Sequence, residues 1–118
     1  MKVELIRSNG FGRRERVVID DLPVMIGSDP SSGVRVNDRR VSRLHCLLAE
    51  YEGRLLVRDL NSKHGTFVNG ARVKEVPLMP GDRLTVGKSN FIVSPVNGAA
   101  KLPSAGGEKT LFVVGESG

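Results

Sequence analysis

The stretch NSKHGTFVNG, residues 61–70, concentrates turn-forming and hydrogen-bonding residues around one Phe-Val pair. Its last two residues, Asn69 and Gly70, are among the strongest short signals for a β-hairpin, because both tolerate a backbone with positive φ. The polar residues that precede Gly65 have no such explanation. The stretch therefore predicts a strand and a hairpin, preceded by a loop with a separate role.

Short runs rich in Val, Ile and Leu recur on both sides of this stretch, with Gly, Pro, Asn and Asp between them. This pattern is typical of an all-β sandwich or barrel, and helical signals are weak throughout. The predicted strands are residues 3–6, 14–19, 24–27, 34–36, 44–50, 54–59, 66–69, 72–74, 83–86 and 91–94. The segments YEG, NGA, VPLMPGD and GKSN are expected to be turns, and Leu44, Leu47 or Leu56 to contribute to the core.

Length and composition indicate one globular domain, because the chain has 118 residues, 39% of them apolar and 26% charged. No run approaches the roughly 20 apolar residues of a membrane span, and the first residues lack the pattern of a secretory signal. One cysteine, Cys46, forms no internal disulfide and is compatible with a reducing compartment. We therefore expect a cytoplasmic domain without membrane contact, and the net charge of +5 favours anionic partners.

The composition changes near residue 95. Residues 1–95 hold all the predicted strands, whereas the next segment, VNGAAKLPSAGGEKT, is rich in small residues and poor in core formers. We expect residues 1–95 to form the domain and interpret residues 96–118 as a flexible linker or the start of a following region.

Two further segments, MIGSDP at residues 25–30 and DRRVSRLH at residues 38–45, are as polar as the opening stretch. The chain thus contains, in order, Gly-x, Ser-Arg-x-His, Ser-x-x-Gly-Thr-x-x-Asn-Gly and Pro-Gly-Asp-Arg-Leu. This order and spacing resemble a forkhead-associated (FHA) domain over residues 3–93. The resemblance implies a β-sandwich of about eleven strands, whose loops at one end bind a phosphothreonine in an extended segment of a partner protein.

The resemblance also implies which residues bind the phosphopeptide. Ser42 matches the family's serine, whose hydroxyl donates to the phosphate, and Arg43 follows at a position that contacts the phosphate or the peptide backbone. Lys63 matches a loop position that commonly contacts the phosphate. His64 stands where the family often has an Asn that holds the peptide main chain, so binding is expected to vary near about pH 6.5, where imidazole ordinarily titrates.

Ser28 is the main departure from the family's pattern, which has an arginine at this position as a principal phosphate contact. Serine is shorter and uncharged, and we expect the loss of that guanidinium to weaken phosphate binding by roughly 10- to 100-fold. Arg35 and Arg43 also lie near these loops in the sequence. We expect Arg39 and Arg40 to supply the compensating charge.

Other residues of the pattern are expected to support the loops rather than touch a ligand. In the family, the histidine that His45 matches braces the serine loop, and the asparagine that Asn69 matches ties the recognition loops together. Gly27, Gly65 and Thr66 are expected to shape the loops.

The sequence argues against an enzyme, because adjacent residues such as His45 and Cys46 point to opposite faces of a strand and form no nucleophile and base pair. No Gly-x-Ser-x-Gly elbow occurs, and VGKSN lacks the spacing and the following helix of a phosphate loop. With two histidines and one cysteine there is no recognisable zinc spacing either. We expect no cofactor and no metal.

Three alternatives remain open at the level of sequence. In the first, the domain docks an unmodified protein, which agrees with a serine in place of arginine at position 28. In the second, it binds nucleic acid through its basic charge, although few aromatic residues are present for base stacking. A phosphorylated Thr110 occupying the domain's own site is a third. In each case we expect a monomeric module of a larger protein.

Overall fold

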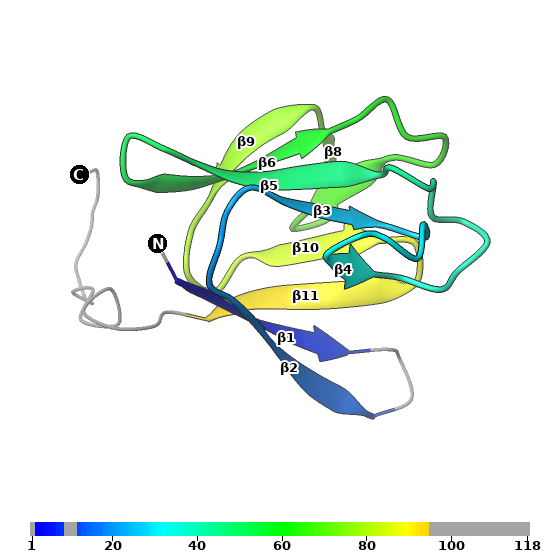
Figure 1. The fold of residues 1–118 in the computed structure, drawn as a ribbon, viewed down its shortest axis with the longest axis horizontal. Coiled ribbons are helices and arrows are strands. Elements are labelled where there is room, and N and C mark those ends of the chain that lie inside the picture. The colour runs from blue at the N-terminus through cyan, green and yellow to red at the C-terminus, as the bar shows by residue number, and fades with distance from the viewer. Residues whose placement is uncertain (1, 9–11, 95–118) are drawn as a thin grey trace.

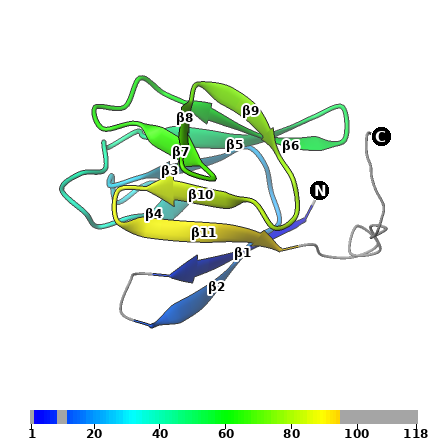
Figure 2. The same cartoon turned by 180° about the vertical axis from the view of Figure 1, so that it is seen from behind.

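The computed structural model describes residues 2–8 and 12–94, which form eleven β-strands and no helix. Figures 1 and 2 show two stacked sheets from opposite sides. The strands are β1 (Val3–Ser8), β2 (Arg14–Ile19), β3 (Val24–Gly27), β4 (Val34–Arg35), β5 (Cys46–Tyr51), β6 (Arg54–Asp59), β7 (Thr66–Val68), β8 (Ala71–Val73), β9 (Glu75–Leu78), β10 (Arg83–Val86) and β11 (Ser89–Ser94). The prediction of an all-β sandwich of about eleven strands is confirmed.

One sheet has six strands in the order β2-β1-β11-β10-β7-β8, and the other has five in the order β4-β3-β5-β6-β9. Every pairing is antiparallel except that of β3 with β4, which is parallel and aligns Gly27 with Arg35. Apolar side chains from both sheets form one core, in which Leu5, Leu48 and Phe91 have no exposed surface. Burial of these side chains is the main source of stability for a domain of this kind.

Two predicted hairpins form as expected. Glu52 and Gly53 join β5 to β6 with φ of +51° and +78°, and Asn69 and Gly70 join β7 to β8 with φ of +52° and +86°. Two successive positive φ angles match a type I′ turn, whose twist follows that of the flanking strands.

One strand was absent from the sequence prediction. A turn was predicted over VPLMPGD, residues 76–82, yet Glu75–Leu78, which includes Pro77, forms β9 and pairs with β6 along one side only. A proline is tolerated on such an edge strand because its missing N–H is not needed for a second neighbour. The predicted GKSN turn is also shorter than expected, since Ser89 and Asn90 belong to β11.

The expected core contribution of Leu44 is wrong, because 54% of its surface is exposed. The buried residues of this hairpin are instead Cys46, Leu48, Leu55 and Val57. Side chains alternate between the two faces of a strand, so a shift of one residue in the assignment exchanges core and outer positions.

The predicted boundary at residue 95 falls outside the described residues, and so does Thr110. The described residues belong to the two sheets and their connections. They contain no helix long and apolar enough to cross a membrane.

Candidate functional site

Three loops meet at one end of the sandwich, on the right in Figure 1. They are residues 28–33 between β3 and β4, residues 36–45 between β4 and β5, and residues 60–65 between β6 and β7. The carbonyl of Ser42 accepts from Ser28 N–H at 3.0 Å, and its hydroxyl oxygen accepts from Lys63 N–H at 3.2 Å. Ser42 therefore connects all three, which we call the recognition loops.

His45 lies beneath the recognition loops and is fully buried. Its Nδ1 accepts from Ser42 N–H at 3.0 Å, and its Nε2 lies 2.8 Å from the carbonyl oxygen of Gly65. Because a carbonyl oxygen only accepts, we assign the ring proton to Nε2, which donates to Gly65. The imidazole thus links the loop of Ser42 to the loop of residues 60–65, with both ring nitrogens hydrogen-bonded inside the protein.

The loop of residues 60–65 rests on the carboxylate of Asp59, at the end of β6. This carboxylate accepts from the N–H and the hydroxyl of Ser62, at 3.1 and 2.5 Å, and from Thr66 Oγ1 at 2.7 Å. Ser62 Oγ accepts in turn from Gly65 N–H at 3.0 Å. Burial opposes ionisation of Asp59, but the hydrogen bonds from Ser62 and Thr66 outweigh it and hold its pKa below its usual range. The loop is therefore organised around the negative charge of a half-buried carboxylate.

Glycine is required at the base of two recognition loops, because other groups approach closely there. A Cβ on Gly27 would overlap the backbone carbonyl oxygen of Arg43, which is not free to move aside. Gly65 has a φ of +94°, and a Cβ on it would lie 2.7 Å from Nε of Arg72. A side chain at position 27 would push the loop of residues 28–33 away from the loop of residues 36–45, whereas at position 65 it is mainly the positive φ that favours glycine.

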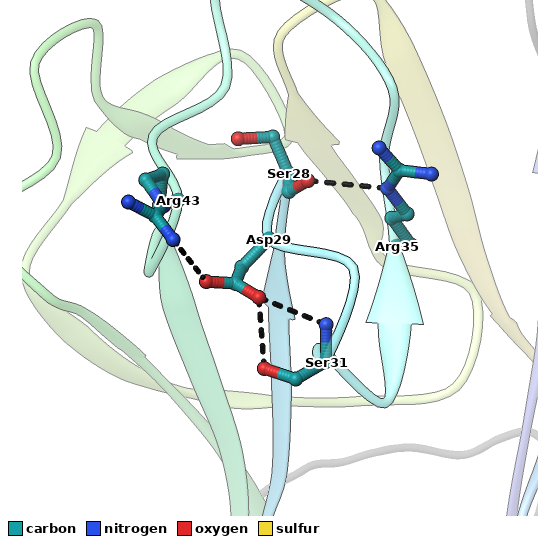
Figure 3. Close-up of polar contacts among 5 residues, drawn as sticks. All are labelled: Ser28, Asp29, Ser31, Arg35 and Arg43. Atoms are coloured by element: carbon teal, nitrogen blue, oxygen red, sulfur yellow. Dashed lines mark hydrogen bonds and ion pairs between the residues drawn. The ribbon is translucent and has the colours of Figure 1, made fainter.

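The loop of residues 28–33 is organised by Asp29, as Figure 3 shows. One carboxylate oxygen accepts from the N–H and the hydroxyl of Ser31, at 2.9 and 2.8 Å, and the other accepts from the guanidinium of Arg43 at 3.0 Å. The hydrogen bonds from Ser31, with a further contribution from Arg43, lower the pKa of Asp29. Arg43, with 80% of its side chain exposed, is thus tethered to this loop.

Arg35 lies on the other side of Ser28, and its Nε–H donates to the Ser28 carbonyl at 3.1 Å. Figure 3 shows the two guanidinium groups of Arg35 and Arg43 flanking this loop, with the Ser28 hydroxyl directed away from Arg35. No acidic side chain among the described residues forms an ion pair with Arg35. The guanidinium of Arg35, which forms no ion pair in the described residues, therefore lies beside the uncharged Ser28.

Lys63 and His64 lie exposed on the loop of residues 60–65. Within residues 2–8 and 12–94, neither side chain has a hydrogen-bond or ion-pair partner. Both side chains are thus accessible to a ligand at the recognition loops.

Arg39 and Arg40, expected to compensate for Ser28, are exposed and line a hollow of about 470 Å³ together with Arg7 and Lys88. Ser28 is not among the residues that line this hollow. The geometry thus favours Arg35 over this pair as the cation next to Ser28.

Asn69 makes its hydrogen bonds away from the recognition loops. Its side chain donates to Asp82 and accepts from Arg83 N–H, both at 3.0 Å, and its own N–H donates to the Arg83 carbonyl. These bonds join the β7–β8 turn to the start of β10. The tie between recognition loops expected of Asn69 is made instead by His45.

His45 and Cys46 do not form a reactive pair. Burial raises the pKa of the Cys46 thiol to about 12, so the nucleophilic thiolate is absent at neutral pH. The imidazole already has partners on both nitrogens. The part of the chain that the structure describes contains no group of three or more His, Cys, Asp or Glu side chains arranged to hold a metal ion.

Two residues of the site, Asp29 and Asp59, were not singled out from the sequence, and Arg35 was named among the nearby arginines but was not the one chosen to compensate for Ser28. The two aspartates carried a usable signal, because each precedes a serine by two or three residues, as in turns closed by a side chain. For Arg35 the signal was weak, since it is one of several arginines near these loops.

Fold and site together define a β-sandwich whose polar loops at one end are held together by hydrogen bonds through Ser42 and His45. An FHA domain family model matches residues 24–87, and the chain therefore belongs to the FHA domain family. FHA domains of this kind occur in proteins named as regulators and inhibitors, among them the oxoglutarate dehydrogenase inhibitor of Corynebacterium efficiens, 30% identical over 88 residues. That match covers 75% of this chain and 62% of the inhibitor.

The chain is also similar to a further curated sequence and to two solved structures. FhaA of Mycobacterium tuberculosis is 41% identical over 70 residues, which cover 58% of this chain and 13% of FhaA. The FhaA FHA domain complexed with the intracellular domain of Rv3910 has a TM-score of 0.68 at 35% identity, covering 77% of this chain and 98% of the other. An FHA domain from an analysis of phosphothreonine-dependent interactions has a TM-score of 0.72 at 33% identity, covering 82% and 99%. The chain thus spans less than two thirds of the length of the two curated relatives, FhaA and the oxoglutarate dehydrogenase inhibitor.

Proposed function

We propose that this FHA domain binds a phosphothreonine-containing segment of a partner protein and acts as a non-catalytic interaction module. The observation that carries the proposal is the hydrogen bond from Lys63 N–H to Ser42 Oγ. It occupies a lone pair of the hydroxyl oxygen and leaves the hydroxyl proton to donate to a ligand. The relative analysed for phosphothreonine-dependent interactions supports this class of ligand.

In this proposal the phosphate sits at the Ser42 hydroxyl, with Lys63 and Arg43 as its cations and His64 against the peptide backbone. A phosphate group carries nearly two negative charges at neutral pH and presents three acceptor oxygens, so it needs several converging donors. Each charge-assisted hydrogen bond contributes roughly 1.5 to 3 kcal/mol.

Arg35 supplies the charge that Ser28 lacks. Its Nε–H donates to the Ser28 carbonyl, which keeps the guanidinium beside the backbone of Ser28. Its two terminal nitrogens make no hydrogen bond within the described residues and are available to the phosphate. Arg39 and Arg40 lie in the separate hollow and are not assigned this role.

The proposal is tested by titrating the chain with a degenerate phosphothreonine peptide pool and its unphosphorylated counterpart, followed by backbone amide NMR at two salt concentrations. We expect phosphate-dependent shifts at Ser42, Arg43 and Lys63 that persist at the higher salt. Absence of shifts with both pools would contradict the proposal.

The role of Arg35 is tested with Arg35→Ala, and with Arg54→Ala as the control that removes an exposed arginine from the β5–β6 hairpin. Arg35→Ala is expected to weaken phosphopeptide binding about tenfold, equal to about 1.4 kcal/mol, and Arg54→Ala to leave it nearly unchanged. Adding Ser28→Arg to Arg35→Ala should restore affinity. Equal effects of the two alanine variants would rule out this role.

Docking of an unmodified protein is the second candidate, favoured by the uncharged side chain at Ser28. The two functions separate in the same titration. Shifts of equal size with phosphorylated and unphosphorylated pools would support this second candidate.

A further inference from the structure

The six-stranded sheet ends at β2, whose outer edge is not covered by any described strand. All six residues of β2, Arg14–Ile19, pair with β1 on one side. Figures 1 and 2 both show β2 at the lower edge of the molecule, with no other strand beyond it. Every second residue of an antiparallel strand directs its N–H and C=O away from the neighbouring strand, so β2 offers a row of backbone donors and acceptors to a further strand.

The other three edges of the two sheets are short or interrupted. The strand β4 has two residues, β8 has three, and β9 has four, one of which is Pro77. Short edge strands and prolines are common means by which proteins keep a sheet from pairing with another chain. The strand β2 is longer and contains no proline. Among the described strands, its edge is therefore the one at which a further strand of ordinary length fits.

The side chains of β2 are accessible over most of the strand. Arg14, Glu15 and Arg16 are exposed although they lie on alternating faces, and only Ile19 at the end of the strand is buried. Val18 has 47% of its surface exposed. A strand added beside β2 therefore meets accessible side chains as well as backbone groups.

The outer face of the six-stranded sheet carries an excess of positive charge. Side chains alternate between the two faces, and Leu5, Ile19 and Phe91 are buried on the inner face, so the strand registers identify the outer positions. The charged residues at outer positions are four arginines and one glutamate: Arg14, Arg16, Arg72, Arg83 and Glu4. This charge favours an acidic partner.

The Glu4 carboxylate on β1 shows how such a charge is satisfied across strands, because it accepts from Nε of Arg16 on β2. No acidic side chain among the described residues forms an ion pair with Arg14. An acidic residue on a strand added to the outer edge of β2 can pair with Arg14 as Glu4 pairs with Arg16.

We propose that the edge of β2 binds an extended acidic segment of a partner protein, which joins the six-stranded sheet as an additional antiparallel strand. In this arrangement two acidic residues, two positions apart, face Arg14 and Arg16, and an apolar residue two positions before them faces Val18. Main-chain hydrogen bonds hold the segment, and the alternate side chains determine which sequences bind. The inference does not rest on the proposed function, because it requires no phosphothreonine. It gives the domain a second binding surface, separate from the recognition loops.

An acidic segment fits this edge better than a second copy of the chain does. Pairing of β2 with β2 of another copy would bring Arg13, Arg14 and Arg16 of both chains onto adjacent strands, about 4.8 Å apart. Like charges on adjacent strands are destabilising, and such repulsion selects against one partner while it leaves the edge open to a partner of opposite charge.

The test uses three synthetic peptides without phosphorylated residues. The peptide TVTETET places both glutamates on one face of a strand, TVTQTQT replaces them with uncharged glutamine, and TVTTEET has the composition of the first but places its glutamates on opposite faces. Each is titrated into the chain and followed by backbone amide NMR and amide hydrogen exchange. We expect TVTETET to shift the amides of residues 14–18, to slow the exchange of every second one, and to bind about tenfold more tightly than the other two peptides.

Three variants locate the binding. The edge variant combines Arg14→Glu with Val18→Thr, and its matched control combines Arg54→Glu with Tyr51→Thr, an exposed cross-strand pair of the five-stranded sheet. Ser42→Ala separates the edge from the recognition loops. We expect the edge variant to lose the binding of TVTETET and the other two to keep it. Unchanged amide shifts in β10 and β11 show that each variant is folded.

Four results would overturn the inference. In the first, TVTETET causes no shift at residues 14–18. In the second, it binds no better than TVTTEET, which would mean that net charge alone attracts it. In the third, the shifts lie in the recognition loops and disappear in Ser42→Ala. In the fourth, every second amide of β2 already exchanges slowly without peptide, which would mean that a second copy covers the edge if the protection rises with chain concentration, or another part of the same chain if it does not. None of these results bears on phosphothreonine binding, which the titration with the phosphorylated pool tests separately.

Discussion

Asp29 and Asp59 each close a local turn in or beside a recognition loop, with a serine two residues on in the first case and three residues on in the second. Each carboxylate accepts the N–H and the hydroxyl of a following serine, Ser31 or Ser62. The remaining partner differs, since Asp59 binds the buried Thr66 and Asp29 binds the exposed Arg43. An aspartate that accepts from a following serine therefore braces one loop from inside and tethers a cation on the surface of the other. Burial of the remaining partner decides which of the two occurs.

The largest difference between the two aspartates is expected in stability. Asp59→Ala leaves the buried Ser62 and Thr66 without their acceptor, so it should lower the free energy of unfolding by about 4 kcal/mol. Asp29→Ala, the matched control, should shift the urea transition far less, because its partners are solvent-accessible. Urea unfolding followed by circular dichroism measures both, and similar midpoints for the two variants would remove the distinction.

The base of the loop of residues 28–33 is tightly packed, whereas the β7–β8 turn is open. Gly27→Ala should destabilise the domain by about 3 kcal/mol, because the added Cβ overlaps the backbone carbonyl of Arg43. Gly70→Ala provides a control in an open turn, where positive φ alone should cost about 1 kcal/mol. Equal losses in thermal unfolding would mean that loop 36–45 moves aside without cost.

The pH dependence of stability sharpens the comparison further. The folded-state pKa of Asp59 lies below its unfolded value of about 3.9, so its contribution is complete above that value and is lost as the pH falls through the folded pKa. We expect the stability of Asp59→Asn to fall less steeply with acid than that of the unaltered chain. Urea titrations between about pH 5 and pH 2 measure the two slopes. Parallel curves would show that the Asp59 charge has no part in the bracing.

The smallest effect is expected on binding. Asp29→Asn keeps an oxygen for Ser31 but releases Arg43 and removes a negative charge near the proposed phosphate. Phosphopeptide affinity should rise about threefold, which isothermal titration calorimetry detects. Weaker binding would indicate that the tether holds Arg43 in its binding position.

Much of the fold followed from local patterns. The strands Arg14–Ile19, Val24–Gly27 and Arg83–Val86 lie where the sequence predicts them, and the Asn69-Gly70 turn has its expected backbone. The strand Glu75–Leu78 was missed because Pro77 suggested a turn, and only the position of β9 at a sheet edge explains why proline is tolerated there.

The sequence by itself determined the all-β class, the family and the residues of the recognition loops, because side-chain alternation, turn geometry and motif spacing are properties of short segments. Only the tertiary structure decided which cation stands beside Ser28 and which cations share the hollow. Parallel pairing of β3 with β4 brings Arg35 to Ser28, and the packing of the six-stranded sheet brings Arg7 to Ser89, 82 residues away. These arginines reach their partners through strand pairing, which no short segment of the sequence encodes alone.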